Sequence, residues 1–300
     1  MRDLEKKVAA PPLRFGKLIH QSLELYYPVG IKRGPHPANT FKKAYQEELV
    51  EAEAKGYQVD AEWEENLWLG IDMLEHYVDT YGKDEHWEIL ATELQFVAPI
   101  TNARGEVIGE YVGVLDNVMR NRSDKTIWFR DHKTAKSIDT GYLAMDDQSS
   151  GYWTFGPWWL RKEGILGPKQ NISGIEFNFL RKAFKDTRPK NDEGQYLNKD
   201  GTVSKVQPPP HFHQHLSFRG EHERELTRQR CVAELYEIAM VRDAELALLK
   251  SPDKMNCKFC DVRDICELHE TGNDWQAMMK MIMQPREDFI KIAVDYEHEH

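Results

Sequence analysis

Residues 113–133 read GVLDNVMRNRSDKTIWFRDHK, and this stretch decides the fold of the chain. It continues an alternation of apolar and polar residues that is typical of a β-strand over residues 107–119. The turn signal Asn-Arg-Ser-Asp at 121–124 precedes a second alternating run at 126–133. Two strands joined by so short a turn predict an antiparallel hairpin.

This hairpin is expected to bring three charged side chains to one end of the sheet. Asp116 shares a strand face with valines, where a carboxylate is costly to bury unless it binds a cation. Asp131 and Lys133 lie two residues apart on the next strand, so they point to the same side. Two neighbouring carboxylates repel each other unless a divalent ion lies between them, and Mg²⁺ or Mn²⁺ suits such oxygen ligands.

A lysine beside such an ion can orient or deprotonate a water molecule and neutralise charge that develops on a phosphate. The three residues therefore favour a metal-assisted phosphodiester hydrolase. The Asp-x-Lys spacing alone is a weak signal, because Glu5-x-Lys7 and Glu53-x-Lys55 share the pattern. On spacing alone, Asp131 and Lys133 could equally form an exposed ion pair at a sheet edge.

The rest of the chain surrounds these strands with helices. Helical spacing of apolar residues precedes a first strand at 89–97, and it returns at 145–162 before a further strand at 171–180. This order predicts an α/β (α+β) fold with a small mixed central sheet flanked by helices. We expect a single domain over residues 1–300, with these regions in order: N-terminal helices 15–86, catalytic core 87–182, loop or insertion 183–215, and C-terminal helices 220–284 with a cysteine cluster.

The motifs around the hairpin resemble those of one nuclease family. Gly113-x-x-Asp116, Asp131-x-Lys133 and Gln148-x-x-x-Tyr152 follow one another in the order of the RecB-type branch of the PD-(D/E)xK nucleases. His20 resembles the histidine metal ligand of that branch, and Glu93 resembles its additional carboxylate. The resemblance implies a restriction-endonuclease-like core and a site in which Mg²⁺ or Mn²⁺ is held by His20, Glu93, Asp116, Asp131 and the main-chain carbonyl of His132.

The resemblance also implies that Lys133 positions the attacking water and that cleavage leaves a 5′-phosphate. We interpret the polar pair Gln148 and Tyr152 as contacts to the nucleic-acid strand or to the catalytic strand. Basic stretches at 120–136 and 181–190 are candidates for phosphate contacts. The residues expected to bind DNA are Gln148, Tyr152, Arg120, Arg122, Lys136, Arg181 and Lys182.

The formal net charge of −10 does not exclude a DNA partner. Residues 41–90 hold fourteen acidic residues and four lysines, so the whole excess lies outside the proposed catalytic strands. No apolar run reaches the roughly 18 residues that a membrane span needs, and the N-terminus has no apolar signal core. We therefore expect a cytoplasmic protein of a bacterium or of a phage in its host, with no membrane partner.

A cysteine cluster near the C-terminus has the spacing of thiolate metal ligands. Cys257, Cys260 and Cys266 resemble the C-terminal triplet of RecB-type nucleases that hold an iron–sulfur cluster. In those nucleases the fourth cysteine precedes the nuclease motifs, and here no cysteine precedes His20. Cys231 as the fourth ligand would permit a [4Fe–4S] cluster, His269 would suit Zn²⁺, and three thiols without metal are the remaining alternative. The run His211-Phe-His213-Gln-His215 is interpreted as a solvated segment of the loop.

The function that these motifs favour is a metal-dependent DNA exonuclease of recombination, repair or phage DNA metabolism. DNA end processing of the CRISPR-adaptation type and structure-specific endonuclease activity are the enzymatic alternatives. A non-catalytic nucleic-acid-binding scaffold that keeps the nuclease fold is the alternative of another class. The chain has no Gly-x-x-x-x-Gly-Lys-Ser/Thr motif, so ATP-driven unwinding would need a helicase or recombinase partner.

Overall fold

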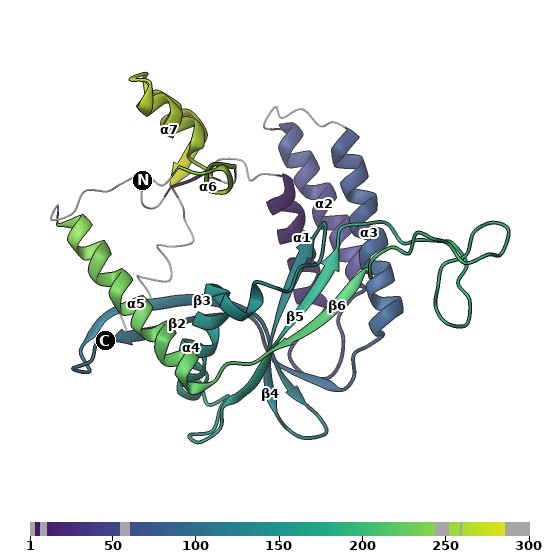
Figure 1. The fold of residues 1–300 in the computed structure, drawn as a ribbon, viewed down its shortest axis with the longest axis horizontal. Helices are drawn as coiled ribbons and strands as arrows, with labels where there is room; N and C mark the ends of the chain where they lie inside the picture. The colour runs from purple at the N-terminus through teal and green to yellow at the C-terminus, as the bar shows by residue number, and fades with distance from the viewer. Residues whose placement is uncertain (1–3, 7–10, 55–60, 244–251, 259, 286–300) are drawn as a thin grey trace. The chain divides into compact units, whose positions relative to one another are not determined.

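The computed structural model describes residues 4–6, 11–54, 61–243, 252–258 and 260–285 (Figure 1). The chain divides into two compact units. Phe15–Met240 form the larger unit, and Met1–Arg14 together with Val241–His300 form the smaller one. That residues 1–300 work as one nuclease domain stays a prediction.

The larger unit is built on a five-stranded mixed sheet with the strand order β2-β3-β4-β5-β6 (Figure 1). The first three strands form the expected antiparallel meander, β5 runs parallel to β4, and β6 runs antiparallel to β5. The helix α4 (Asp147–Lys162) makes the crossover that a parallel pair requires. This arrangement confirms the α/β fold with a mixed central sheet. The strand bounds are β2 Trp87–Thr101, β3 Val107–Asn121, β4 Ile127–Ala135, β5 Ile172–Arg181 and β6 Phe212–Ser217.

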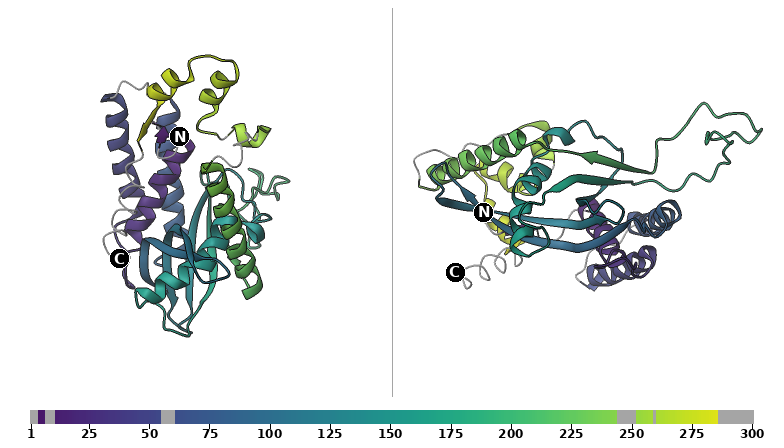
Figure 2. Two further views of the ribbon diagram at one scale, coloured as in Figure 1. Left: turned by 90° about the vertical axis from the view of Figure 1, so that its left-hand side faces the viewer. Right: turned by 90° about the horizontal axis from the view of Figure 1, so that it is seen from below.

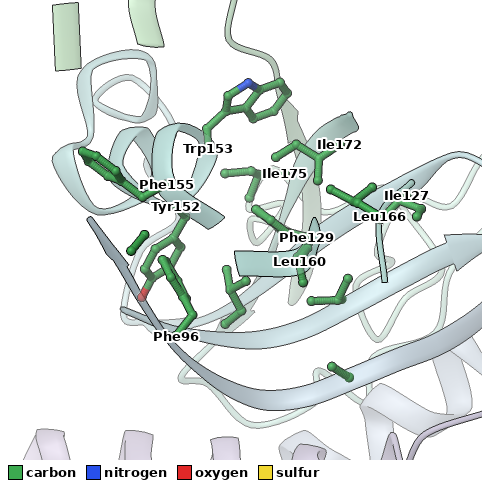
Figure 3. Close-up of a cluster of buried hydrophobic side chains, with 14 of the residues drawn as sticks. Phe96, Ile127, Phe129, Tyr152, Trp153, Phe155, Leu160, Leu166, Ile172 and Ile175 are labelled. Carbon is green, nitrogen blue, oxygen red and sulfur yellow. The ribbon is translucent and has the colours of Figure 1, made fainter. Parts of the chain in front are cut away.

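One face of the sheet packs against α4 and forms the main hydrophobic core (Figure 3). Phe129 of β4 is fully buried there, and Tyr152 and Phe155 project from α4 toward the sheet. Each buried aromatic side chain removes about 150–250 Å² from water, so this core supplies much of the driving force for folding. The core fixes α4, and therefore Gln148, relative to the catalytic strands.

The other face is covered by three N-terminal helices, α1 (Pro11–Tyr26), α2 (Pro37–Ala54) and α3 (Ala61–Tyr81). Figure 2 shows them grouped on one side of the sheet. Their buried side chains, such as Ile19 and Tyr77, form a second cluster that includes Met119 of β3. The acidic residues of these helices are largely exposed, and their apolar residues face inward.

The segment expected to be a loop over residues 183–215 is more ordered than its composition indicates. Residues 183–211 form an arm closed by isolated bridges between Lys190 and Tyr196 and between Leu197 and Val203. The last residues of the segment belong to β6, an edge strand with half-buried side chains.

The interpretation of the three histidines as a solvated segment was wrong. His211 is buried, with its ring 4.9 Å from that of His76, and His213 and His215 are half-buried on β6. The sequence pattern did not indicate a strand here, because its residues are mostly polar and an edge strand needs little apolar surface.

The long helix α5 spans Glu221–Arg242 in the region where C-terminal helices were expected, and residues 244–251 lie outside the described part of the chain. Described elements of the smaller unit are the antiparallel pair β1 (Leu4–Lys6) and β7 (Met283–Pro285), and the helices α6 (Lys254–Lys258), α7 (Arg263–Glu270) and α8 (Trp275–Ile282). Among the described helices, none combines the length and the apolar character of a membrane span.

Candidate active site

Glu93 and Asp116 face each other across the β2–β3 pair, and the residues on either side of them are paired in register. The backbone of Glu93 adopts the left-handed region, with φ 43°. A residue with a Cβ pays about 1–2 kcal/mol for that conformation. Backbone strain of this kind is found preferentially at functional sites.

A histidine from the helical layer completes a cluster with these two carboxylates. His20 of α1 places its Nδ1 3.4 Å from Oδ2 of Asp116. One ligand atom each from His20, Glu93 and Asp116 lies within 4.8 Å of the others. In the described part of the chain this is the single group of three or more His, Cys, Asp or Glu residues that is gathered so closely.

The third strand contributes through both its backbone and its side chains. The β3–β4 ladder ends at the pair Asn117–Arg130. Two positions after Arg130, the backbone N–H of His132 donates to the side chain of Asp116, at 2.6 Å between N and Oδ2. A carboxylate thus takes the place of a backbone acceptor, and the pairing of β3 with β4 ends at the site.

Asp131 and Lys133 form an ion pair beside this cluster. The Nζ of Lys133 lies 3.1 Å from Oδ1 and 2.9 Å from Oδ2 of Asp131. It also donates to Oε1 of Gln148 at 2.8 Å, and Gln148 in turn donates to the hydroxyl of Tyr152 at 2.8 Å. Gln148 therefore contacts β4, the strand expected to be catalytic, and α4 holds the lysine in place.

The charges at the site shift one another's protonation equilibria. Burial, followed by the charge of Asp116, raises the pKa of Glu93 to about 7. The same two causes raise the pKa of Asp131 to about 6, although Lys133 opposes the shift. Burial also acts on Asp116, but its hydrogen bond and charge interaction with His20 outweigh burial and lower its pKa.

The pKa values of the two basic side chains at the site, His20 and Lys133, are raised, although burial alone would lower them. Burial lowers the pKa of His20, but the hydrogen bond to Asp116 and the surrounding negative charge leave it above the usual value. Lys133 follows the same pattern, with Asp131 as the main opposing charge. Negative charge thus dominates the site, as a site for a divalent cation requires.

A buried polar network fixes His132, and the sequence reasoning missed it. The Oδ1 of Asn117 lies 3.2 Å from Nε2 of His132, and Nδ2 of Asn178 lies 2.9 Å from Nδ1. An amide oxygen can only accept and an amide nitrogen can only donate, so Nε2 carries the proton and the ring is neutral. Burial lowers the pKa of His132 to about 3, in agreement with this tautomer.

The network continues into the helical layer. Asn178 donates to Tyr77, whose hydroxyl lies 2.8 Å from that of Tyr27, and Tyr27 donates to Asp84 at 3.3 Å. The fully buried guanidinium of Arg130 donates to Asp84 at 2.8 Å and to Glu176 at 2.6 Å. The available sequence signal was the alternation of Glu176 and Asn178 with phenylalanines on β5, which indicates a polar stripe on a buried strand.

The basic residues expected to bind DNA separate into two groups. Lys136 and Lys182 follow the ends of the parallel strands β4 and β5, and Arg181 is paired with Ala135 in the register. Burial and the nearby charge of Lys136 lower the pKa of Lys182. Arg120 and Arg122 lie at the opposite end of the sheet, where Arg120 pairs with Glu88 at 3.4 Å and Arg122 is exposed.

The four cysteines are free thiols, all half-buried. Cys231 belongs to the larger unit, where it lines a pocket of about 300 Å³ together with Tyr111, Gln148 and Arg230. Cys257, Cys260 and Cys266 belong to the smaller unit. Within the described residues the three thiols do not form a group with ligand atoms within 4.8 Å, so a metal site at these cysteines stays a prediction.

Comparisons with known proteins bear on the family of the chain. The model of the PD-(D/E)XK nuclease superfamily matches residues 2–267. No protein of curated function matches the sequence. A solved structure of a candidate exonuclease from Eubacterium rectale is similar over 85% of this chain and 81% of that one, with 11% identity and a TM-score of 0.38, which is too distant to carry an argument.

Proposed function

Because the chain belongs to the PD-(D/E)XK nuclease superfamily, a superfamily of phosphodiester hydrolases, we propose that it is a DNA nuclease dependent on Mg²⁺ or Mn²⁺. The cluster of His20, Glu93 and Asp116 is the observation that carries this proposal. Carboxylate oxygens and an imidazole form a donor set that suits Mn²⁺ and, through the oxygens, Mg²⁺.

The protonation behaviour of the cluster supports a cation at this position. Burial and then the nearby charge of Asp116 raise the pKa of Glu93 to about 7, so these two carboxyl groups do not readily carry charge together without a cation. We propose that His20, Glu93 and Asp116 hold the ion, assisted by Asp131 and the main-chain carbonyl of His132. When bound, the ion polarises the scissile phosphate and lowers the pKa of an attacking water.

Lys133 is proposed to position the attacking water. Its ammonium group already contacts Asp131 and Gln148, so both its place and its charge are fixed before substrate binds. A fixed cation beside the reacting phosphate stabilises the negative charge that develops in the transition state. Gln148 and Tyr152 act as a support for the lysine in this scheme, and Gln148 is exposed enough to contact the DNA strand.

DNA binding is assigned to basic residues next to this site. Lys136 and Lys182 directly follow the catalytic strand and its parallel neighbour, and Arg181 lies at the same end of β5. Their charges would contact the phosphates on either side of the scissile bond. The resemblance of the motifs to the RecB-type branch favours exonucleolytic cleavage that leaves a 5′-phosphate.

The test is a cleavage assay on end-labelled DNA with Mg²⁺, with Mn²⁺ and with EDTA. We expect cleavage with either ion and none with EDTA, and we expect Asp116→Ala, Asp131→Ala and Lys133→Ala to abolish it. Glu110→Gln is the matched control, because Glu110 is an exposed carboxylate six residues earlier on β3. Substrates with blocked ends and circular DNA separate an exonuclease from an endonuclease, since circular DNA has no end to attack.

Two outcomes would overturn the proposal. Full activity of Asp131→Ala or Lys133→Ala would show that another site performs the cleavage. Absence of cleavage on all substrates, together with no Mn²⁺ binding at the cluster, would favour a non-catalytic nucleic-acid-binding scaffold that keeps the nuclease fold.

A further inference from the structure

A further pocket lies at the end of the sheet that is remote from the proposed catalytic residues. It encloses about 700 Å³ where α1 and α3 end, β2 begins and β3 ends. Pockets that bind small ligands have volumes of about 300–1,000 Å³, so this one can take a nucleotide-sized group. Its lining residues include Tyr26, Ile31 and Val78 as an apolar wall.

Positive charge dominates the rest of the lining. Lys32, Arg33, Lys83 and Arg122 contribute four cations, and Glu85 contributes the one carboxylate among the lining residues. The four cations come from three separate segments of the chain, so they come together only when the chain folds and form no cluster in the sequence.

The structure gives no acceptor for two of these cations. Within the described part of the chain, the ammonium groups of Lys32 and Lys83 make no hydrogen bond or ion pair, and both side chains are exposed. Arg33, in contrast, is held rigidly, because its Nη2 donates to the carbonyls of Asp84 at 2.7 Å and Trp87 at 3.0 Å. The pocket thus combines a fixed guanidinium with two lysine ammonium groups that can donate hydrogen bonds to an anion.

We propose that this pocket binds the phosphate groups of a nucleic-acid strand, an inference that rests on the proposed nuclease function. The ammonium groups of the two exposed lysines can donate to phosphate oxygens, and the fixed guanidinium of Arg33 adds positive charge beside them. The apolar wall offers Tyr26 and two aliphatic side chains to the sugar and base. An acidic protein of net charge −10 gains in this way a local site of opposite sign.

The distance from the catalytic residues gives the pocket a specific role. Arg122 follows Asp116 by six residues along β3, a path of about 20 Å at the rise of an extended strand. Phosphates of one strand of a B-form duplex are spaced about 3.4 Å apart along the axis. At this spacing a strand must span roughly six nucleotides to occupy both places, and a shorter strand can occupy only one of them at a time.

Binding of single-stranded DNA in EDTA tests the inference, because without a divalent ion the strand stays intact. The probes are a fluorescent 12-nucleotide strand and a fluorescent 4-nucleotide strand. In the variant Lys32→Ala/Lys83→Ala we expect the affinity for the 12-nucleotide strand to fall about tenfold at 100 mM salt. The slope of the logarithm of affinity against the logarithm of salt concentration should become smaller by about one to two, because one to two phosphate contacts are lost. The loss is smaller for the 4-nucleotide strand, because this strand cannot occupy the pocket and the catalytic site together.

Two matched variants control for net charge. Lys169→Ala/Lys199→Ala removes the same charge from exposed lysines outside the pocket and leaves the affinity within twofold of the wild type. Glu85→Gln removes the pocket's carboxylate and strengthens binding of the 12-nucleotide strand about threefold. All four lysines are exposed, so the fold tolerates these changes, which circular dichroism verifies.

The results distinguish a nucleic-acid strand from a free nucleotide as the source of the phosphate. They also distinguish failure of the pocket proposal from failure of the proposed nuclease function. If binding of a deoxynucleoside 5′-monophosphate and of both strands falls by the same factor, the pocket binds a free nucleotide and the inference of a strand-binding pocket is overturned. Unchanged affinity of the pocket variant for the strands and the monophosphate, or an equal loss in the Lys169/Lys199 control, would overturn the inference. Cleavage of end-labelled DNA by the wild type tests the nuclease function separately, since the pocket is measured without a divalent ion.

Discussion

The backbone N–H of His132 and the Oδ2 of Asp116 are joined by a hydrogen bond of 2.6 Å. The peptide that follows Asp131 is thereby bound to the carboxylate proposed to hold the metal. The imidazole of the same residue is fixed by Asn117 and Asn178 in the buried layer behind the sheet. The catalytic strand is consequently held on both sides of its backbone, by the site and by the core.

Replacing His132 tests whether this anchoring serves the site. His132→Ala leaves Asn117 and Asn178 without a shared partner, which should destabilise the protein by about 2–4 kcal/mol and weaken Mn²⁺ binding at least tenfold. Tyr77→Phe is the control, since it breaks the next link of the network without touching His132. Calorimetric Mn²⁺ titration and urea unfolding measure the two effects. An unchanged Mn²⁺ affinity in His132→Ala would contradict the anchoring role.

Metal binding should depend strongly on pH. Protons compete with the ion for Glu93, whose pKa lies at about 7, and for Asp131, whose pKa lies at about 6. Mn²⁺ affinity should therefore rise at least tenfold between pH 5.5 and 7.5 and level off above that range. Titration calorimetry in buffers of different ionisation enthalpy counts the protons released. No proton release at pH 6 would disagree with the assignment of Glu93 as a ligand.

Glu93→Gln should stabilise the metal-free protein at neutral pH. A carboxyl group with a raised folded-state pKa stabilises the fold when protonated, and this contribution is lost as pH rises from about 4.5 to about 7. The neutral amide avoids the loss, so the melting temperature at pH 7.5 should rise by about 2–4 °C, or about 1 kcal/mol after discounting for solvent exposure.

The same variant should show no gain at pH 4, where the native glutamate is already protonated. It should also lose cleavage activity, since it lacks a charged ligand. A melting temperature that falls at pH 7.5 would show that the carboxylate of Glu93 is not strained by its neighbours. Differential scanning calorimetry at the two pH values gives the comparison.

Gly113 should be sensitive to a single methyl group. A Cβ at this position would lie 2.6 Å from Phe96 and 2.9 Å from Tyr152, so Gly113→Ala has to displace both rings. We expect a destabilisation of about 1–3 kcal/mol and slower cleavage, because Tyr152 supports Gln148 and, through it, Lys133. Gly167→Ala, with its nearest neighbour at 3.9 Å, is the control that should be neutral in thermal unfolding and cleavage.

The cysteine cluster is tested by the colour of the protein. We expect anaerobically purified protein to contain metal, with a broad visible absorption band for an iron–sulfur cluster or one equivalent of zinc in a colourless sample. Cys260→Ser and Cys231→Ser, measured by metal analysis, decide whether Cys231 is the fourth ligand. Metal-free protein under these conditions would leave the cysteines as ordinary thiols.

The sequence predicted the elements that local patterns specify. Strand alternation located β2, β3 and β4, and the hairpin turn required that Asp116 and Asp131 meet at one end of the sheet. Partners that come from distant segments could not be read in this way. Asn178 and Tyr77 are 101 residues apart in the sequence and meet only in the fold. The lysines of the pocket proposed to bind phosphate come from segments without any motif. Likewise β6 lacked the apolar alternation by which strands are found, because it lies at the edge of the sheet.

The left-handed backbone of Glu93 limits how far this protein can be stabilised by substitution without loss of a carboxylate from the cluster. Glycine is the residue that adopts such a conformation freely, so a search for stabilising substitutions would converge on glycine at this position. That substitution removes a carboxylate from the cluster. The chain therefore gives up conformational stability to keep an acidic group at one point of the sheet, and engineering for heat resistance has to work around this residue.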